Sequence, residues 1–331
     1  TQNPKKAAAI LQLVKDLIAQ SDVVVENFGP GVMERLGLGY EELAKLKKDI
    51  ILFSMPGAGL YGPMKDLRTY GLSLTSTTGL DSLVGYKGGD PIPVQNAYSD
   101  PFAGIFGAFA ILTALNHRRN TGVGQHIDFS QQEAVMQMVG PAYMDYQLNG
   151  RSGGPKSNEH PVNAAAPHGV FPCKGDDRWI SIAVASDDEW HQLLEALKHP
   201  EWLKVAEFAT LESRVKHIDT LHKLIGEWTA QFDDRELAAL LQQHGVAAAP
   251  VLNVGDLLDD PHYKARQTFI EGTHPLGFKE TIYGAYVKLS ESEPVVRPGP
   301  VIGQDNDRVF KEILGMSAER YDDLVKRQII Y

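Results

Sequence analysis

The opening part of the chain alternates between helical periodicity and short apolar runs. Residues 5–20 place apolar side chains on one helical face, with lysine and aspartate on the other. The runs at 23–25 and 50–53 are typical of buried parallel strands, and a helix is predicted between them at 41–48. Strand, helix and strand in succession predict a right-handed parallel crossover, and therefore an α/β fold. Because the chain opens on a helix, we expect the first strands of this sheet to lie outside it.

A long apolar helix is predicted at 101–119. Large apolar residues are interleaved there with glycine and alanine, which allow neighbouring elements to approach closely. A helix that is apolar nearly all round is expected to be buried. A strand at 126–129 and a helix at 131–148 follow, and Pro141 should bend this second helix.

The second half of the chain predicts a smaller α+β domain and then a return to the first. The predicted elements are a strand at 179–184, helices within about 187–244, a strand at 247–254, an extended segment at 290–303, and helices at 309–314 and 318–326. We therefore divide the chain into a large domain (1–150), a linker (151–175), a small domain (176–285) and a C-terminal return to the large domain (286–331).

The composition is that of a globular protein with an acidic surface. Of the 331 residues, 43% are hydrophobic and 22% are charged, and the formal net charge is -10. Such a chain, without a basic stripe, argues against binding to nucleic acid or to an anionic membrane. No apolar run reaches the roughly 18 residues of a membrane span. Lys15 and Asp16 interrupt the first apolar stretch, which argues against a signal peptide. We expect a soluble, cytoplasmic protein.

Asp100 precedes Pro101 at the start of the apolar helix. Aspartate commonly caps the first turn of a helix, and proline commonly occupies the first helical position. The same geometry suits catalysis, because the positive end of a helix keeps a carboxylate ionised, as a nucleophile must be. Spacing alone leaves both roles open.

A second candidate site is the loop that follows the strand at 23–25. It reads Glu26-Asn27-Phe28-Gly29-Pro30-Gly31 and opens a helix at Val32. Backbone N–H groups in such a loop can receive phosphate, and Arg35 is placed to add a bidentate contact. Its glycines match neither standard nucleotide-binding fingerprint, so an ordinary connecting loop is the alternative.

Other chemistries have little support in the sequence. The eleven histidines include no His-x-x-x-His or His-Glu-x-x-His pair, so no metal site is predicted. His160 and His168 flank the loop at 161–167, but nothing marks them as ligands. The single cysteine, Cys173, excludes an internal disulfide and a multi-cysteine zinc site, and we interpret it as a packed thiol. A Gly-x-Ser-x-Gly nucleophile motif is absent.

Several short segments occur together in an order that is characteristic of one enzyme family. They are Ser-Asp-Val-Val-Val-Glu-Asn-Phe at 21–28, Gly-Pro-Gly-Val-Met-Glu-Arg-Leu-Gly at 29–37, Asp100 with Gly104, Thr-Gly-x-Gly-Gln at 121–125 with Asp128-x-Ser130, Gly-Val-Phe-Pro at 169–172, and a closing segment from Gly303 to Ile329. Together they resemble the class III CoA-transferases, the CaiB/BaiF family, over almost the whole chain.

The resemblance implies a fold and a set of site residues. The fold is a Rossmann-like large domain with a smaller α+β domain, in a dimer whose two chains are linked like rings. The catalytic aspartate of the family falls on Asp100. Its CoA-contacting positions fall on Asn27, Phe28, Arg35, Met55, Gly57 and Ala58, and its active-site loop falls on Asn163, Ala164 and Ala165. This loop is glycine-rich in some members, so the alanines here should make it stiffer. The opening segment of the family, with basic residues for the CoA phosphates, is absent from this sequence.

The implied reaction moves CoA from an acyl-CoA donor to a carboxylic acid. It passes through an aspartyl anhydride and an aspartyl-CoA thioester on Asp100, with coenzyme A as a substrate and neither a metal nor a tightly bound cofactor. Succinyl-CoA is a common donor in the family, so a dicarboxylate is the expected acid. The expected partner is a second copy of the chain or a related subunit.

Two alternatives to this reading remain open. A 2-methylacyl-CoA racemase of the same fold would need a histidine near Tyr70, and no histidine occurs between Thr1 and Asn116. A non-catalytic partner subunit of a hetero-oligomeric CoA-transferase is the other alternative, although the presence of Asp100 argues against it.

Overall fold

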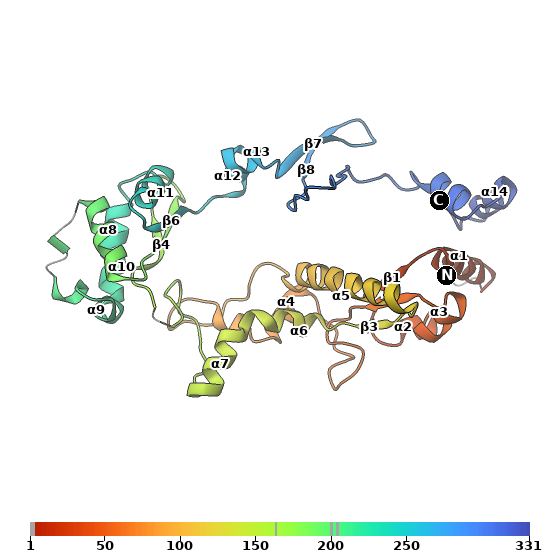
Figure 1. Ribbon diagram of the computed structural model, residues 1–331, viewed down its shortest axis with the longest axis horizontal. Coiled ribbons are helices and arrows are strands. Elements are labelled where there is room, and N and C mark those ends of the chain that lie inside the picture. The colour runs from red at the N-terminus through yellow and green to blue at the C-terminus, as the bar shows by residue number, and fades with distance from the viewer. Residues whose placement is uncertain (1–3, 163, 199–200, 203–204) are drawn as a thin grey trace.

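The computed structural model describes residues 4–162, 164–198, 201–202 and 205–331. The chain is a mixed α/β protein with one parallel and two antiparallel sheets among these residues. Its first part, which we call the large unit (residues 4–149), holds the parallel sheet. A second, more helical part, which we call the small unit (residues 166–250), has its own hydrophobic core (Figure 1).

The parallel sheet of the large unit has the strand order β1-β2-β3. Its strands are β1 (Val23–Glu26), β2 (Ile51–Ser54) and β3 (His126–Asp128), and the helices before β2 are α1 (Pro4–Ala19), α2 (Val32–Arg35) and α3 (Tyr40–Leu46). Every residue of β2 is buried, as the apolar run at 50–53 predicts. The predicted parallel crossover between β1 and β2 is confirmed, with Val23 opposite Ile51.

Helices from residue 71 to residue 149 complete the large unit. They are α4 (Gly71–Ser76), η1 (Asp81–Leu83), α5 (Ser99–Thr121), α6 (Gln131–Met136), η2 (Gln137–Val139) and α7 (Gly140–Asn149). The predicted bend at Pro141 is confirmed, because the helix is interrupted by the short 3-10 turn η2 and restarts at Gly140. Proline supplies no N–H to continue the hydrogen-bond ladder at that point.

The prediction that the helix at 101–119 is buried all round is wrong. In α5 the large side chains of Ile105, Phe109 and Leu112 are 61%, 71% and 65% exposed. The small residues form the packed face instead: a Cβ added to Gly107 would lie 2.7 Å from Cζ of Phe53 in β2. The interleaved small residues therefore mark one close-packed face, and this chain alone leaves the opposite apolar face open to solvent.

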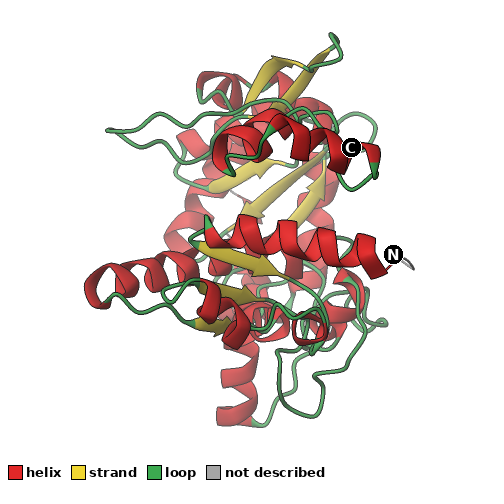
Figure 2. Cartoon of the chain, turned by 90° about the vertical axis from the view of Figure 1, so that its right-hand side faces the viewer, coloured by secondary structure: helices red, strands yellow, loops and turns green. Residues whose placement is uncertain are grey.

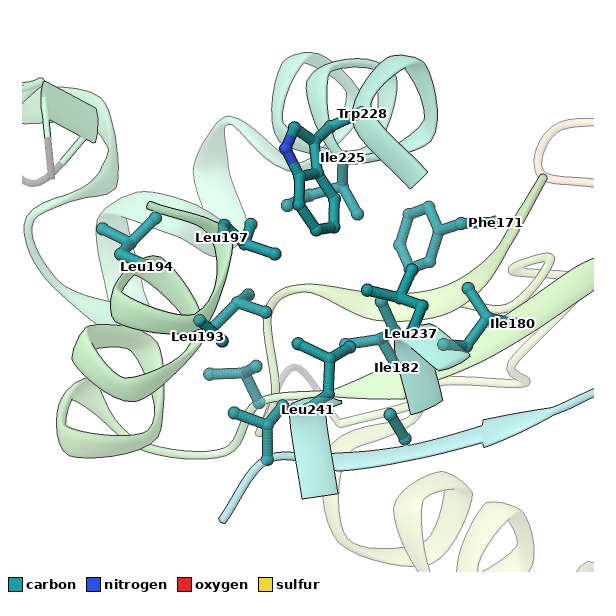
Figure 3. Close-up of a cluster of buried hydrophobic side chains, with 14 of the residues drawn as sticks. Phe171, Ile180, Ile182, Leu193, Leu194, Leu197, Ile225, Trp228, Leu237 and Leu241 are labelled. Carbon is teal, nitrogen blue, oxygen red and sulfur yellow. The ribbon is translucent and has the colours of Figure 1, made fainter. Parts of the chain in front are cut away.

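The small unit packs helices on an antiparallel sheet. Its strands are β4 (His168–Pro172), β5 (Trp179–Ala183) and β6 (Ala247–Pro250), and its helices are α8 (Asp187–Leu197), η4 (Ala206–Phe208), α9 (Leu211–Lys216), α10 (Ile218–Thr229) and α11 (Asp234–Gln243). Ile180 and Ile182 from β5 meet Leu193, Leu237 and Leu241 in the core (Figure 3). Strand β4 lies within the segment expected to be a linker.

The chain then returns to its starting point. The returning elements are α12 (Val254–Asp259), α13 (Pro261–Ala265), the hairpin of β7 (Phe269–Thr273) and β8 (Lys279–Tyr283), the π-helix η5 (Asp307–Ile313) and α14 (Ala318–Lys326). Leu13 of α1 packs with Met316, Leu324 and Ile330 from the C-terminal segment. Arg320 and Asp16 form an ion pair of 3.1 Å between the same parts. The two ends therefore meet, and the chain closes into a ring (Figures 1 and 2).

This ring leaves an unusually large surface exposed. The chain exposes 21132 Å². A compact monomer of 36.4 kDa exposes about 13,500 Å² by the usual scaling of surface with mass. The excess is about 7,600 Å², and the exposed side chains include large apolar ones, such as those on α5. Apolar surface exposed to this extent is typical of faces that a partner or a further segment covers.

Candidate functional site

The carboxyl edge of the parallel sheet carries the first group of candidate residues. Strand β1 ends at Glu26, whose carboxylate accepts a hydrogen bond of 2.7 Å from the backbone N–H of Phe28. This contact turns the chain so that Asn27 and Phe28 are exposed. Helix α2, which follows, is only one turn long. We therefore expect side chains, rather than the end of this helix, to bind an anion here.

Two adjoining hollows lie at this edge. The first has a volume of about 370 Å³, and its lining includes Asn27, Phe28, Gly57 and Tyr70. The second has a volume of about 330 Å³, and its lining includes Arg35. Five residues line both hollows, so that they form one continuous groove: Gly29, Pro30, Lys65, Leu67 and Arg68. The structure thus brings four of the predicted CoA contacts to one groove.

Met55 and Ala58 are not part of the lining of this groove. Met55 instead supports the wall of the groove by backbone hydrogen bonds. Its N–H donates to the carbonyl of Glu26 over 3.0 Å, and its carbonyl accepts from Nε2 of Gln131 over 2.8 Å. These two bonds join the ends of β1 and β2 to the start of α6.

Lys65 and Arg68 are groove residues that the sequence patterns did not reveal. Together with Arg35 they give the groove three cationic side chains. All three are exposed, and none of them has an ion-pair partner among the residues that the structure describes. The lining also includes one carboxylate, that of Asp66, so three cations against one anion leave the groove positively charged, which suits a polyanionic ligand. The only sequence signal was a pair of basic residues three positions apart in a loop, which is too common to single out.

Asp100 lies in the first turn of α5, but it does not cap the helix. The helix begins one residue earlier, at Ser99, with Tyr98 as the N-cap, and no side chain makes a capping hydrogen bond. The interpretation of Asp100 as a cap is therefore wrong. Its side chain is exposed, and its nearest polar contact is the Ser99 hydroxyl at 3.4 Å. The carboxylate is free to meet a substrate.

Gly71 connects Asp100 to the groove. A Cβ added to Gly71 would lie 3.3 Å from Oδ2 of Asp100 and 2.2 Å from Cβ of Ala97. Only glycine permits this close approach. Tyr70, the residue before it, lines the first hollow and is 91% exposed. The carboxylate of Asp100 consequently lies beside the end of the groove at which α4 begins.

The predicted active-site loop lies at the entrance to the small unit. Asn163 is outside the described residues. Ala164 is exposed, and its N–H donates to Nδ1 of His160 over 3.2 Å. Ala165 and Ala166 are buried, and the N–H of Ala166 donates to the carbonyl of Val184 over 2.8 Å. Within the part of the chain that the structure describes, no hydrogen bond joins this loop to Asp100.

Comparison with known proteins identifies the family. The sequence profile of CoA-transferase family III matches residues 4–306. The chain belongs to this family. The chain is 31% identical to the beta subunit of succinyl-CoA–L-malate CoA-transferase from Chloroflexus aurantiacus, covering 99% of this chain and 80% of that protein. It is also 31% identical to succinyl-CoA–D-citramalate CoA-transferase from the same organism, covering 96% and 79%.

The fold agrees with this assignment. The crystal structure of a CAIB/BAIF family protein from Brucella suis superposes with a TM-score of 0.82 at 29% sequence identity, covering 92% of this chain and 78% of that one. The resemblance to the CaiB/BaiF family is therefore confirmed, and the chain is an enzyme of the CoA-transferase class. Enzymes of family III act on CoA thioesters.

The remaining candidates add no further reactive group. Cys173 is buried, and burial raises the pKa of its thiol to about 11, which confirms that it is a packed thiol rather than a nucleophile. Among the described residues, no cluster of histidine, cysteine, aspartate or glutamate is arranged to hold a metal ion. Across the same residues, no helix combines the length and the apolar character needed to cross a membrane.

Proposed function

We propose that this family III enzyme transfers CoA between two carboxylic acids by covalent catalysis at Asp100. The observation that carries the proposal is the position of this carboxylate. It is exposed, it makes no capping bond, and it lies against Gly71 at the end of a groove lined by cations. A carboxylate nucleophile divides a difficult exchange into easier covalent steps.

The reaction proceeds through four acyl exchanges. Asp100 attacks the thioester carbonyl of the donor, the C–S bond breaks, and an acyl-aspartyl anhydride and CoA thiolate result. The thiolate attacks the aspartyl carbonyl, which releases the donor acid as a carboxylate and leaves CoA as a thioester on Asp100. The acceptor carboxylate attacks this thioester and releases the thiolate again. The thiolate then attacks the acceptor carbonyl of the new anhydride, which yields the new acyl-CoA and restores Asp100.

The groove provides the CoA site. Arg35, Lys65 and Arg68 pair with the phosphates in the second hollow, while Asn27, Phe28 and Gly57 border the first hollow, which leads toward Asp100. Met55 and Ala58, which flank the lining residues Pro56 and Gly57 in the chain, are assigned to the region of the thioester. The loop at Ala164 and Ala165 covers the reacting atoms. Backbone N–H groups near the thioester stabilise each tetrahedral oxyanion.

The active protein is an intertwined dimer, with either a second copy or a related subunit. Its support is the excess surface of the ring and the open apolar face of α5. A heteromer is a natural alternative, because one relative at 31% identity is the beta subunit of its enzyme. Two relatives use succinyl-CoA by name, so succinyl-CoA is the donor that we propose, with a dicarboxylic acid as the acceptor class.

The decisive experiment replaces Asp100 by asparagine. Asp100→Asn retains the size of the side chain but removes the nucleophilic oxygen, so transfer should fall by more than about 10³-fold. The free energy of unfolding should change by less than about 0.5 kcal/mol, since Asp100 is exposed and does not cap α5. The control is Asp176→Asn, an exposed aspartate in a turn of the small unit.

A trapping experiment tests the covalent step directly. Wild-type enzyme is incubated with succinyl-CoA and then with hydroxylamine, and the peptides are mapped by mass. We expect a hydroxamate on the peptide that contains Asp100. Full activity in Asp100→Asn, or a label confined to another peptide, would contradict the proposal.

A further inference from the structure

A loop of the large unit is hydrogen-bonded to the connecting segment (residues 150–165), which leads into the small unit. We call this loop, residues 84–92, the clasp. Its two sides are joined by a bridge between Gly85 and Pro91 and by the N–H of Ile92, which donates to the carbonyl of Val84 over 2.8 Å. The buried carboxylate of Asp81 fixes the base of the clasp, because it accepts from the N–H of Val94 over 3.2 Å.

The same carboxylate connects the clasp to the element beside Asp100. Oδ2 of Asp81 accepts from the Ser76 hydroxyl over 2.6 Å, and Ser76 is the last residue of α4. The first residue of α4 is Gly71, which lies against Asp100. Hydrogen bonds through Asp81 therefore link the base of the clasp to α4, the helix that begins beside the proposed nucleophile.

Ser157 is the point at which the clasp holds the connecting segment. Its N–H donates to the carbonyl of Gly85 over 3.1 Å, and its hydroxyl accepts from the N–H of Lys87 over 2.9 Å. Ser157 also has a φ of 54°, in the left-handed region that a residue with a side chain rarely adopts. Such a conformation persists only where the surroundings enforce it. The hydrogen bonds to Gly85 and Lys87 hold Ser157 in this conformation.

Lys87 also forms an ion pair with the small unit. Its Nζ lies 2.7 Å from Oε1 of Glu159 in the connecting segment and 3.2 Å from Oδ1 of Asp219 on α10. The hydrogen bond to Glu159 raises the pKa of Lys87, so the side chain stays charged. One ammonium group thus joins three parts of the chain: the large unit, the connecting segment and the small unit.

In the connecting segment, the proposed active-site loop follows directly after Ser157 and Glu159. The carbonyl of Asn158 lies 2.6 Å from Nδ1 of His168, the first residue of β4. Nδ1 of His160 accepts from the N–H groups of Val162 and Ala164, and the His160 and His168 rings meet edge to face at 5.2 Å. A shift at residues 157–159 would therefore pass to the loop.

We propose that Lys87 is a positioning residue for CoA transfer: through the clasp it fixes the active-site loop and the small unit relative to the body that carries Asp100. This inference rests on the proposed function. Lys87 does not line the groove, so it acts through the segment that it holds. Acyl exchange requires water to be kept from the aspartyl-CoA thioester. A loop displaced by even about 1 Å can slow a reaction by roughly 10²-fold, and it also admits water.

The test compares Lys87→Met with wild type. Methionine keeps the length of the side chain and removes the charge. Because both ion pairs of Lys87 are partly exposed, we expect the variant to stay folded. The rate of CoA transfer should fall by roughly 3–10-fold, while CoA affinity stays unchanged. Hydrolysis, in which water attacks the thioester to give free CoA and Asp100, should rise relative to transfer. Hydrogen exchange should become faster in the peptide spanning 156–167.

Two further variants serve as rescue and control. Lys87→Arg retains a cation between both carboxylates and should restore the ratio of transfer to hydrolysis. Lys216→Met removes an exposed ion pair of 2.7 Å with Glu212 that lies within the small unit and bridges nothing, so it should behave as wild type. If Lys87→Met unfolds, Asp219→Asn removes only the contact with α10 and should show the same changes to a smaller degree.

The outcomes separate this inference from the proposed function. Unchanged hydrolysis and unchanged exchange in Lys87→Met would overturn the role of the clasp while leaving the chemistry at Asp100 intact. A parallel loss of CoA affinity would also overturn it, because Lys87 would then act on binding. If the wild type transferred no CoA, both the proposed function and the role of Lys87 in transfer would fail. Hydrogen exchange in the 156–167 peptide of Lys87→Met would still decide whether the clasp anchors the loop.

Discussion

The open apolar face of α5 leads to a quantitative prediction about assembly. Phe109 is the natural residue to change, because 71% of it is exposed and it points away from the small-residue face that packs on β2. Replacing it by alanine should leave the ring itself unaffected. Alanine is also the best helix former, so α5 should be no less stable.

The expected effect on the dimer follows from the exposed fraction. Removing a fully buried phenylalanine from a core costs about 3–5 kcal/mol. If a partner buries the 71% that the single chain exposes, the loss is roughly 2–3 kcal/mol for each copy of Phe109. A symmetric dimer contains two copies, so dissociation becomes easier by roughly 4–6 kcal/mol. This corresponds to about a 10³–10⁴-fold increase in the dissociation constant.

Sedimentation over a range of concentrations measures this constant directly. The control is Leu46→Ala at the end of α3, a helix that packs on α1 rather than beside α5. We expect the control to associate like the wild type. Two results would refute the reasoning: a wild-type chain that is monomeric at micromolar concentration, or a Phe109→Ala variant that dissociates no more easily than Leu46→Ala.

Two further variants test the groove and its link to Asp100. Arg35→Ala should weaken CoA binding by about 1.5–3 kcal/mol, the scale of a hydrogen bond to a charged group, whereas Arg266→Ala, which lines neither hollow, should not. If calorimetry showed unchanged CoA affinity in Arg35→Ala, Lys65 and Arg68 would be the residues that bind the phosphates. Gly71→Ala would bring a Cβ to 2.2 Å from Cβ of Ala97 and shift the start of α5, so kcat should fall roughly 10–100-fold. The control is Gly104→Ala, whose added Cβ meets nothing within 4 Å and which should be fully active. Equal kcat values in these two glycine variants would show that Gly71 does not position Asp100.

Local features of the sequence predicted most elements correctly, because their causes are local. The β-branched runs gave β1 and β2, and Pro141 marked the interruption before α7. The error at α5 has a physical reason. Periodicity records which residues are apolar, but not which of two apolar faces the same chain covers. The small residues at 103, 107 and 114 were the available signal, since they share one face and are all buried.

The site was predictable only in part. Asn27, Phe28, Arg35 and Gly57 were proposed from the family resemblance, and the fold brings them to one groove. Lys65 and Arg68 join Arg35 across about thirty residues of sequence, a proximity that only the folded loop creates. The contact between Gly71 and Asp100 is likewise invisible in the sequence, because it depends on how α4 meets α5. Substrate choice, the covalent intermediate and the domain boundaries stay predictions.

Closure of the ring has a consequence for biosynthesis. Asp16 and Arg320 are separated by 304 positions, so the contact between α1 and α14 forms only after every element between them has been synthesised. Until then α1 lacks the apolar cover that Met316, Leu324 and Ile330 provide. Two closed rings cannot become linked without opening one of them. In a linked dimer, the partner must therefore thread through before the C-terminal segment docks, which makes this docking the last step of assembly.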